Sequence, residues 1–242
     1  MSYPLEVINL TKSYHNKIAI AELSFTIESG EVIGLLGVNG AGKSTLIKCL
    51  LDLVDFDAGA ISIFGQTHTL TSARSKLSYL GEQFIPPRFA TGKDVLRLMA
   101  GLEGMNLPTE EVRRHCELLA LEESVLESTC QSYSKGMRQK LGLIACLITA
   151  KPLMLLDEPM SGLDPLARRL FKDRIIEQRE AGRTVFFSTH LLEDISSVCD
   201  RVIVLDRGQL KFIGAVDEFL NSTQQANLEA AFLASIATDA AA

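Results

Sequence analysis

The sequence lacks the features of several large protein classes. Basic residues are not in excess: its 242 residues include 24 lysines and arginines against 30 aspartates and glutamates, a formal net charge of −6. Because the backbone of a nucleic acid demands a basic face, this balance argues against a nucleic-acid partner. Long apolar runs are also missing. The longest, residues 141–150, falls short of the roughly 20 residues that span a membrane and is typical of a buried helix.

The cysteines and the N-terminus lack two further signals. The five cysteines are scattered without C-x-x-C pairs, which argues against a metal site or a disulfide framework. We therefore expect reduced thiols, with Cys49 and Cys146 on apolar helix faces. Residues 1–6 have neither the basic start nor the apolar core of a secretory signal, so we expect a cytoplasmic protein.

What the sequence does contain is a glycine-rich stretch, residues 37–45, with the pattern G-x-x-x-x-G-K-[ST] directly after the apolar run 32–36. The pattern predicts a phosphate-binding loop between a strand and a helix, because its glycines let backbone N–H groups turn inward around a polyphosphate. Lys43 would reach the β- and γ-phosphates, and the Ser44 hydroxyl would bind Mg²⁺. Alone, the pattern could be a glycine-rich turn with an incidental lysine. The expected nucleotide contacts in the loop are Gly37, Asn39, Gly40, Ala41, Gly42, Lys43, Ser44 and Thr45.

Two further apolar runs deliver polar side chains at their ends. Residues 153–156 lead into Asp157 and Glu158, and residues 184–188 lead toward His190. Each run alone could be a core strand followed by an ordinary polar turn. With the loop, they predict a doubly wound parallel sheet, in which ligands bind at the carboxyl ends of the strands. One carboxylate could hold Mg²⁺ while the other takes a proton from water.

The order of these motifs resembles a known family. A serine-glycine segment, YSKGM at residues 133–137, opens a helical apolar pattern, and SGLDP at residues 161–165 follows the acidic strand end. In order, the phosphate loop, these two segments, the paired acids and His190 are similar to the motifs of the ATP-binding cassette (ABC) ATPases. The resemblance extends from Leu5 to about Phe219, which is almost the whole chain.

The resemblance implies an α/β fold: a P-loop NTPase core with an N-terminal antiparallel β subdomain and an inserted α-helical subdomain. We expect one ABC ATPase domain over residues 1–220, with the helical subdomain at about 86–150. Residues 221–242 form a tail that could be a frayed terminus. Within it, the run 228–233 is similar to a short terminal helix of exporter-type cassettes.

The resemblance also assigns roles to the strand-end residues. It implies that Asp157 and Ser44 hold Mg²⁺, and that Glu158 is the base that polarises the attacking water. His190 looks like the family's switch histidine, which hydrogen-bonds the γ-phosphate. Tyr14 matches the aromatic residue that stacks on the adenine ring, although alone it would be an ordinary strand aromatic.

The serine-glycine segment is expected to act on a second copy. In the family, this signature of one cassette caps the ATP held by the phosphate loop of the other, so Ser134 and Gly136, with Asp164, would contact nucleotide across a homodimer. No second phosphate loop occurs in the sequence, which agrees with one cassette in each chain. The segment departs from the commonest family signature by Tyr133 for leucine, Lys135 for the first glycine and Met137 for glutamine. Lys135 could add charge at the nucleotide or be a solvated lysine.

The function that the resemblance implies is to bind and hydrolyse ATP, with ATP and Mg²⁺ as cofactors, and so to power a membrane transporter. The partners would be a second cassette and transmembrane permease subunits, which would hold the cytoplasmic protein at the inner face of the membrane. The signature and the terminal helix favour an exporter. The alternative is a soluble ABC ATPase of iron–sulfur cluster assembly. A simple nucleotide kinase would leave Ser134, Gly136 and the Asp164 loop unexplained.

The segment after residues 77–80 carries two more expectations. The family places a glutamine there that contacts Mg²⁺ or the attacking water; the matching register puts Glu82 at that position and Gln83 one residue later. Because adjacent side chains of an extended segment point to opposite sides, both cannot serve equally, and we favour Glu82 as a metal ligand. The family docks its membrane subunits near the residues that follow. We expect exposed apolar contacts there from Phe84, Ile85 and Phe89.

Overall fold

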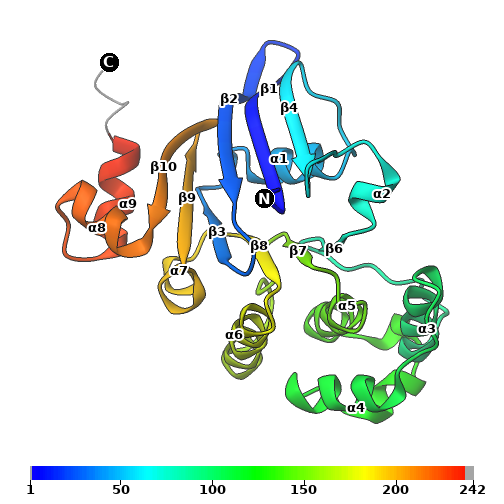
Figure 1. The fold of residues 1–242 in the computed structure, drawn as a ribbon. Helices are drawn as coiled ribbons and strands as arrows, with labels where there is room; N and C mark the ends of the chain where they lie inside the picture. Colours follow the sequence, from blue (N-terminus) through cyan, green and yellow to red (C-terminus); the bar gives the residue numbers. More distant parts are fainter. Residues whose placement is uncertain (1, 238–242) are drawn as a thin grey trace.

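The computed structural model describes residues 2–237, which form two β-sheets with helices around them (Figure 1). The smaller, four-stranded sheet is antiparallel and has the order β2-β1-β4-β5. Its strands are β1 (Leu5–Tyr14), β2 (Lys17–Ile27), β4 (Ala58–Ile63) and β5 (Gln66–Thr67). The N-terminal antiparallel part predicted from the sequence is therefore present.

The larger sheet within residues 2–237 has six strands in the order β10-β9-β3-β8-β7-β6. The strands are β3 (Val32–Leu36), β6 (Leu77–Leu80), β7 (Leu153–Leu156), β8 (Thr184–Thr189), β9 (Arg201–Asp206) and β10 (Gln209–Ala215). Neighbouring strands are parallel except at the edge, where β10 pairs with β9 in the antiparallel sense. Because the parallel strands point the same way, β3, β6, β7 and β8 all end at one edge of the sheet.

Helices and their connections fill the segment between β6 and β7 in the part of the chain that the structure describes. The α-helices are α1 (Lys43–Leu50), α2 (Thr71–Arg74), α3 (Gly92–Leu102), α4 (Thr109–Leu118), α5 (Lys135–Ile148), α6 (Pro165–Glu180), α7 (Leu192–Val198), α8 (Val216–Thr223) and α9 (Leu228–Ala237), with 3₁₀ helices η1 (Glu123–Glu127) and η2 (Cys130–Ser132). Figure 1 shows α3 and α4 in a lobe that lies beyond α5. A capping box begins α3: the Asp94 N–H donates to the Thr91 side chain and the Thr91 N–H donates to the Asp94 carboxylate, each at 3.1 Å.

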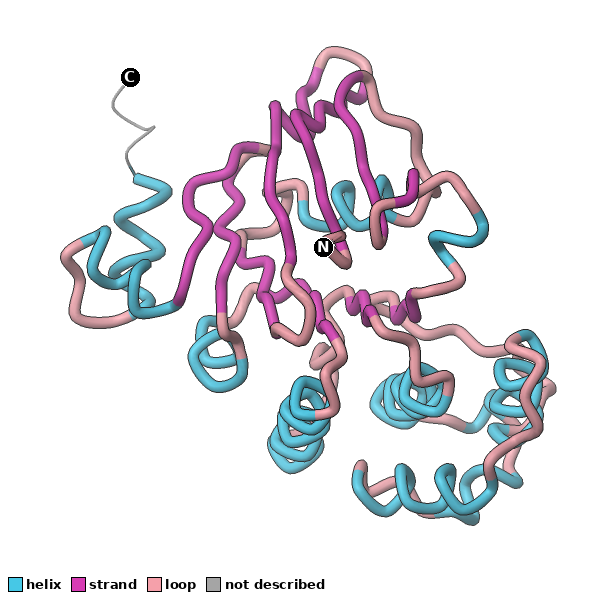
Figure 2. The backbone as a smooth tube through the Cα atoms, viewed as in Figure 1, coloured by secondary structure: helices cyan, strands magenta, loops and turns pink. Residues whose placement is uncertain are grey.

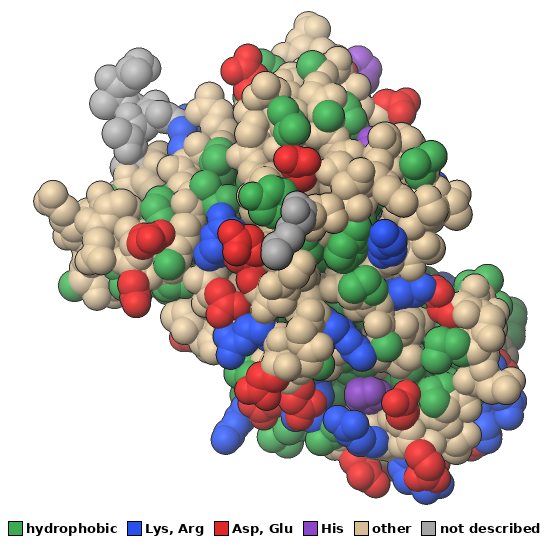
Figure 3. All heavy atoms as spheres, viewed as in Figure 1, with side chains coloured by type: hydrophobic (Ala, Val, Ile, Leu, Met, Phe, Trp, Pro, Cys, Tyr) green, Lys and Arg blue, Asp and Glu red, His purple; other side chains and the backbone are tan. Residues whose placement is uncertain are grey.

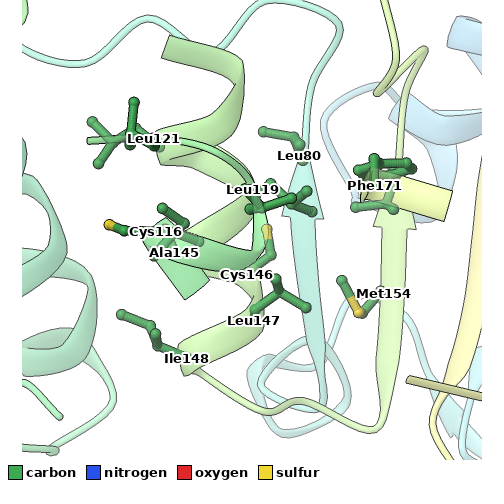
Figure 4. Close-up of a cluster of buried hydrophobic side chains, with 14 of the residues drawn as sticks. Leu80, Cys116, Leu119, Leu121, Ala145, Cys146, Leu147, Ile148, Met154 and Phe171 are labelled. Carbon is green, nitrogen blue, oxygen red and sulfur yellow. The ribbon is translucent and has the colours of Figure 1, made fainter. Parts of the chain in front are cut away.

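Alternate residues of β7 point into two different cores. Met154 and Leu156 lie in the cluster that α5 and α6 cover, shown in Figure 4, whereas Leu153 and Leu155 face the cluster around α1 and the smaller sheet. All four side chains are completely buried, as expected for a central parallel strand covered on both faces. Figure 2 shows helices on both sides of the larger sheet. The cores thus fix β7, which carries the acidic pair at its end.

The cysteines agree with the sequence prediction of reduced thiols. All are free; Cys49, on α1, and Cys146, on α5, are buried among apolar side chains. Burial raises the pKa of the Cys49 thiol to about 11 and that of Cys146 to about 12, so both stay protonated at neutral pH.

The C-terminal helices α8 and α9 pack beside β10 and α7. Phe219 of α8 and Ala231 of α9 are completely buried in a third cluster, and the Phe219 ring lies 4.9 Å from that of Phe212 on β10. Among residues 2–237, no helix has both the length and the apolar character required to cross a membrane.

Gly142 on α5 generates a prediction about stability. A Cβ atom there would lie 2.6 Å from Leu80 Cδ1 and 2.7 Å from Phe84 Cγ, so a larger residue would have to displace the side chain of Leu80 on β6 and the ring of Phe84. We expect Gly142→Ala to lower the free energy of unfolding by about 1–2 kcal/mol in urea denaturation, because overpacking outweighs the gain in helix propensity.

Gly101 on α3 is the matched control, since a Cβ there would meet no atom within 4 Å. Gly101→Ala is expected to raise the free energy of unfolding by about 0.5–1 kcal/mol through helix propensity alone. Equal effects of the two substitutions would contradict the close approach of α5 to β6.

Candidate active site

The polar residues that follow the parallel strands line one pocket of about 730 Å³. Of the residues predicted from the sequence, the pocket is lined by Tyr14, Asn39, Gly40, Gly42, Lys43, Ser44, Thr45, Glu82, Glu158 and His190. Tyr14 is the last residue of β1, and the ammonium of Lys12 lies 4.9 Å from the centroid of its ring. The strand β1 belongs to the smaller sheet, whereas the strands that end at the phosphate loop, Glu158 and His190 belong to the larger sheet. The pocket therefore joins the two sheets.

The glycines of the phosphate loop are required by its backbone and by close packing. Gly40 and Gly42 have φ values of 85° and 111°, a region that side-chain-bearing residues rarely adopt. A Cβ at Gly37 would lie 2.5 Å from the carbonyl oxygen of Leu205, so this glycine faces the sheet rather than the pocket. Ala41 is also buried, and its carbonyl accepts a hydrogen bond of 2.8 Å from the Gly208 N–H. Gly37 and Ala41 therefore support the loop on the side away from the pocket.

Glu158 is the centre of the charged groups in the pocket. Its Oε1 lies 3.4 Å from the Lys43 ammonium, and its Oε2 lies 2.9 Å from Nδ1 of His190. Lys43 is 6% exposed and donates to the carbonyl of Gly37 at 2.7 Å, which anchors the cation under the loop. Glu158, which follows β7, thus contacts both Lys43, which begins α1, and His190, which follows β8.

Ser188 on β8 bonds both acidic residues at the end of β7, a role that the sequence did not predict. Its hydroxyl donates to Asp157 Oδ1 at 2.6 Å and accepts from the Glu158 N–H at 2.9 Å. Glu158 has φ 46°, a strained conformation for a residue other than glycine. The only sequence signal was a serine two residues before His190. A serine in an apolar strand is not informative until its neighbours are known.

Glu82 and Gln83 diverge as expected for adjacent residues of an extended segment. Glu82 lines the nucleotide-sized pocket, whereas Gln83 lines a second cavity of about 460 Å³ beside α5. Phe84 corrects an expectation: it is half-buried against the core rather than an exposed contact, because Gly142 leaves room for its ring.

The pocket does not include every residue that the sequence predicted. Ser134 and Asp164 are helix caps here: the Ser134 hydroxyl accepts from the Met137 N–H at 3.2 Å, and Asp164 Oδ1 accepts from the Ala167 N–H at 2.9 Å. The second hydrogen bond lowers the pKa of Asp164. Gly136 lies beside the loop of Asp164, since a Cβ there would be 3.3 Å from the carbonyl oxygen of Gly162.

Lys135 contacts its own chain, an arrangement that the sequence did not suggest. Its ammonium donates to the hydroxyl of Ser161 at 3.0 Å, and its stem lies over Gly162. Ser161 in turn lines the pocket. The remaining lining residues that the sequence analysis missed are Lys17, Ile18, Ala19, Val38 and Arg207, for which no pattern gave a signal.

The oxygen groups in the pocket fit Mg²⁺ rather than a softer metal. No group of three or more His, Cys, Asp or Glu side chains in residues 2–237 forms a ready metal site. Mg²⁺ does not need one, because it keeps several waters and binds substrate phosphates beside one or two carboxylates. The hydroxyl of Ser44 and the carboxylate of Glu82 line the pocket and are ligands of that kind. The Asp157 carboxylate is buried and does not line the pocket.

Comparison with known proteins agrees with this geometry. The ABC transporter family model matches residues 20–161, more than half of the chain. The chain belongs to the ABC transporter family. Its P-loop NTPase fold is confirmed by a solved ATP-binding subunit of an ABC transporter, which is 32% identical and has a TM-score of 0.87, covering 96% of this chain and 98% of the other.

Two relatives of this ABC cassette are similar to it in sequence but longer. An ABC transporter ATP-binding protein of Nostoc sp. is 37% identical over 85% of this chain, and the Nod factor export ATP-binding protein I of Sinorhizobium fredii is 35% identical over 85%. The matches span 62% and 61% of those proteins. ABC ATP-binding domains bind ATP and are ATPases, so membership supports an ATPase activity here.

Glu82 and Gln83 line different cavities, and this difference leads to a prediction about the magnesium dependence of ATPase activity. If the Glu82 carboxylate binds the metal in this ABC cassette, Glu82→Ala should raise the Mg²⁺ concentration for half-maximal ATPase activity by roughly tenfold or more. Gln83→Ala is the matched control and should titrate like the wild type. A crippled Gln83→Ala beside a normal Glu82→Ala would show that the register is wrong.

Proposed function

We propose that this chain is the ATP-binding and ATP-hydrolysing subunit of a membrane ABC transporter of the exporter type. The observation that carries the proposal is the meeting of Lys43, Glu158 and His190 in one pocket under a phosphate-binding loop. Cleavage of ATP needs a cradled γ-phosphate, neutralised charge and a base beside the attacking water, and these three groups with the loop amides can supply them.

Each residue has a role set by its position. The loop amides and the Lys43 ammonium would bind the β- and γ-phosphates, and the ring of Tyr14 would stack on adenine. Glu158 would accept the proton of the water, and His190 would hydrogen-bond the γ-phosphate. Ser44, Asp157 and Glu82 would hold Mg²⁺, which neutralises phosphate charge when bound.

The contact between Lys43 and Glu158 would change on ATP binding. The proposed nucleotide site needs the Lys43 ammonium, which forms a 3.4 Å ion pair with Glu158. A γ-phosphate carries more negative charge than one carboxylate, so it would compete for Lys43 and leave Glu158 free to face water. ATP binding would thereby expose the base.

A second copy of the chain completes the proposed site. Within residues 2–237, Ser134 and Gly136 are not among the residues that line the chain's own pocket. The hydroxyl of Ser134 still has its proton to donate while it caps α5, and the start of α5 favours an anion. In a homodimer these groups would cap the nucleotide of the partner cassette.

The helical lobe supports docking to permease subunits. Ile85 and Phe89 are 76% and 87% exposed, which is unusual for large apolar side chains. Docking there would hold a cytoplasmic protein at the inner face of the membrane. Export is supported by the 35% identity to a relative whose name refers to Nod factor export.

Glu158→Gln tests hydrolysis and dimerisation together. The amide cannot accept the proton, so we expect ATP turnover to fall by roughly 10²-fold with ATP binding retained. Because hydrolysis reopens the dimer, the variant should elute as an ATP-bound dimer in size-exclusion chromatography with ATP and Mg²⁺. Lys43→Ala should instead lose nucleotide affinity and stay monomeric. A Glu158→Gln variant that is inactive and monomeric at high concentration would refute the dimer.

Phe89→Asp tests the membrane partner. Loss of a central apolar contact typically costs a factor of about ten or more in affinity, so recovery of the chain with membrane permease subunits should fall about tenfold. Leu53→Asp is the control, because Leu53 is also exposed, at 64%, but follows α1 away from the lobe. Recovery of the wild type only in soluble complexes with iron–sulfur assembly proteins would contradict transport.

A further inference from the structure

A buried carboxylate bonds Thr189, the residue before His190. Asp194, on α7, is 1% exposed and accepts hydrogen bonds from Nη2 of Arg168 through both oxygens, at 2.9 and 3.0 Å. The ammonium of Lys172 lies 3.0 Å from Oδ1. Both cations come from α6, one turn apart. Removing a buried carboxylate from water is costly unless cations hold it, so this group stays where α6 places its partners.

Asp194 also controls the turn that carries His190. The hydroxyl of Thr189, the last residue of β8, donates to Asp194 Oδ2 at 3.1 Å and accepts from the Leu191 N–H at 3.0 Å. The residues before and after His190 are therefore joined through one hydroxyl that the carboxylate orients. His190 itself is 48% exposed and contacts Glu158, so its backbone is held while its ring reaches the pocket.

The other end of this connection is the loop of Asp164. Asp164 caps α6 by accepting from the Ala167 N–H, and its carbonyl accepts from the Arg168 N–H at 2.9 Å. Arg168 thus lies in the first turn of a helix whose start is fixed to that loop. Movement of the loop would move Arg168, and the guanidinium would move the carboxylate with it.

We propose that Arg168 is a positioning residue for His190: through Asp194 it orients the turn that carries the histidine and ties that turn to the Asp164 loop. The inference rests on the proposed ATP hydrolysis, in which His190 contacts the γ-phosphate. Lys172 is not equivalent, because it contacts a single carboxylate oxygen and lies a turn farther from Asp164.

Kinetics of Arg168→Met provide the first test. Lys172 still neutralises Asp194 in this variant, so we expect the fold to be retained. We expect kcat to fall about tenfold while KM for ATP stays within about twofold, because His190 is displaced and the phosphate loop is untouched. Arg169→Met, at the exposed neighbour on the same helix, should leave kcat within about twofold. Lys172→Met should lower kcat by less than about threefold, since the two-oxygen contact of Arg168 persists.

The ¹⁵N resonances of the His190 ring, assigned by comparison with His190→Ala, provide a second test that needs no activity. They should shift in Arg168→Met and stay in place in Arg169→Met. A purely stabilising role for Arg168 would lower the melting temperature without moving these signals or separating kcat from KM.

Several results would overturn the inference. They are unchanged His190 resonances in Arg168→Met, unchanged kcat, a parallel loss of ATP affinity, or an equal loss in Lys172→Met. If Arg168→Met does not fold, Arg168→Lys keeps a cation but removes the guanidinium whose Nη2 touches both oxygens of Asp194; it should lower kcat about threefold, and wild-type kinetics would overturn the role. An inactive wild type with shifted His190 resonances in Arg168→Met would contradict only the proposed function.

Discussion

The parallel register of β3, β8 and β7 is the constraint on which the candidate site depends. Leu36 pairs with Thr189 and Leu156 with Phe187, so the phosphate loop, His190 and the two acids all begin at the same edge of the sheet. Each strand is buried on both faces, and a slip of one residue would turn every side chain to the opposite face. The same hydrophobic burial that stabilises the sheet therefore fixes the distances between its polar ends.

The polar groups at this edge are stabilised by one another rather than by solvent. A left-handed residue other than glycine costs about 1–3 kcal/mol, and Glu158 adopts this conformation at the point where its carboxylate meets Lys43. The hydroxyl of Ser188 compensates by bonding both the Glu158 N–H and Asp157. The residue to which we assign the proton transfer is therefore one of the ten non-glycine residues in 2–237 that have a positive φ.

Polar contacts also connect the helical lobe to the pocket. Lys135, at the start of α5, bonds Ser161 in the loop after Glu158, and that loop ends at Asp164, which caps α6. From α6, Arg168 reaches Asp194, which bonds the residue before His190. The helix α5, which packs against α3 and α4, and the turn of His190 therefore belong to one sequence of contacts.

The sequence by itself determined the features that depend on neighbours along the chain. These are the phosphate loop, whose glycines satisfy local backbone geometry, the buried parallel strands, whose apolar runs are continuous, and the capping box of α3. Only the tertiary structure decided which side of its segment Glu82 faces, that Phe84 packs inward, and that Ser188 and Asp194 hold the residues around them. Ser188 lies 31 residues from Asp157, and Asp194 lies 26 from Arg168. Such partners meet only when the sheet and its helices have packed, and no local pattern in either segment encodes the contact.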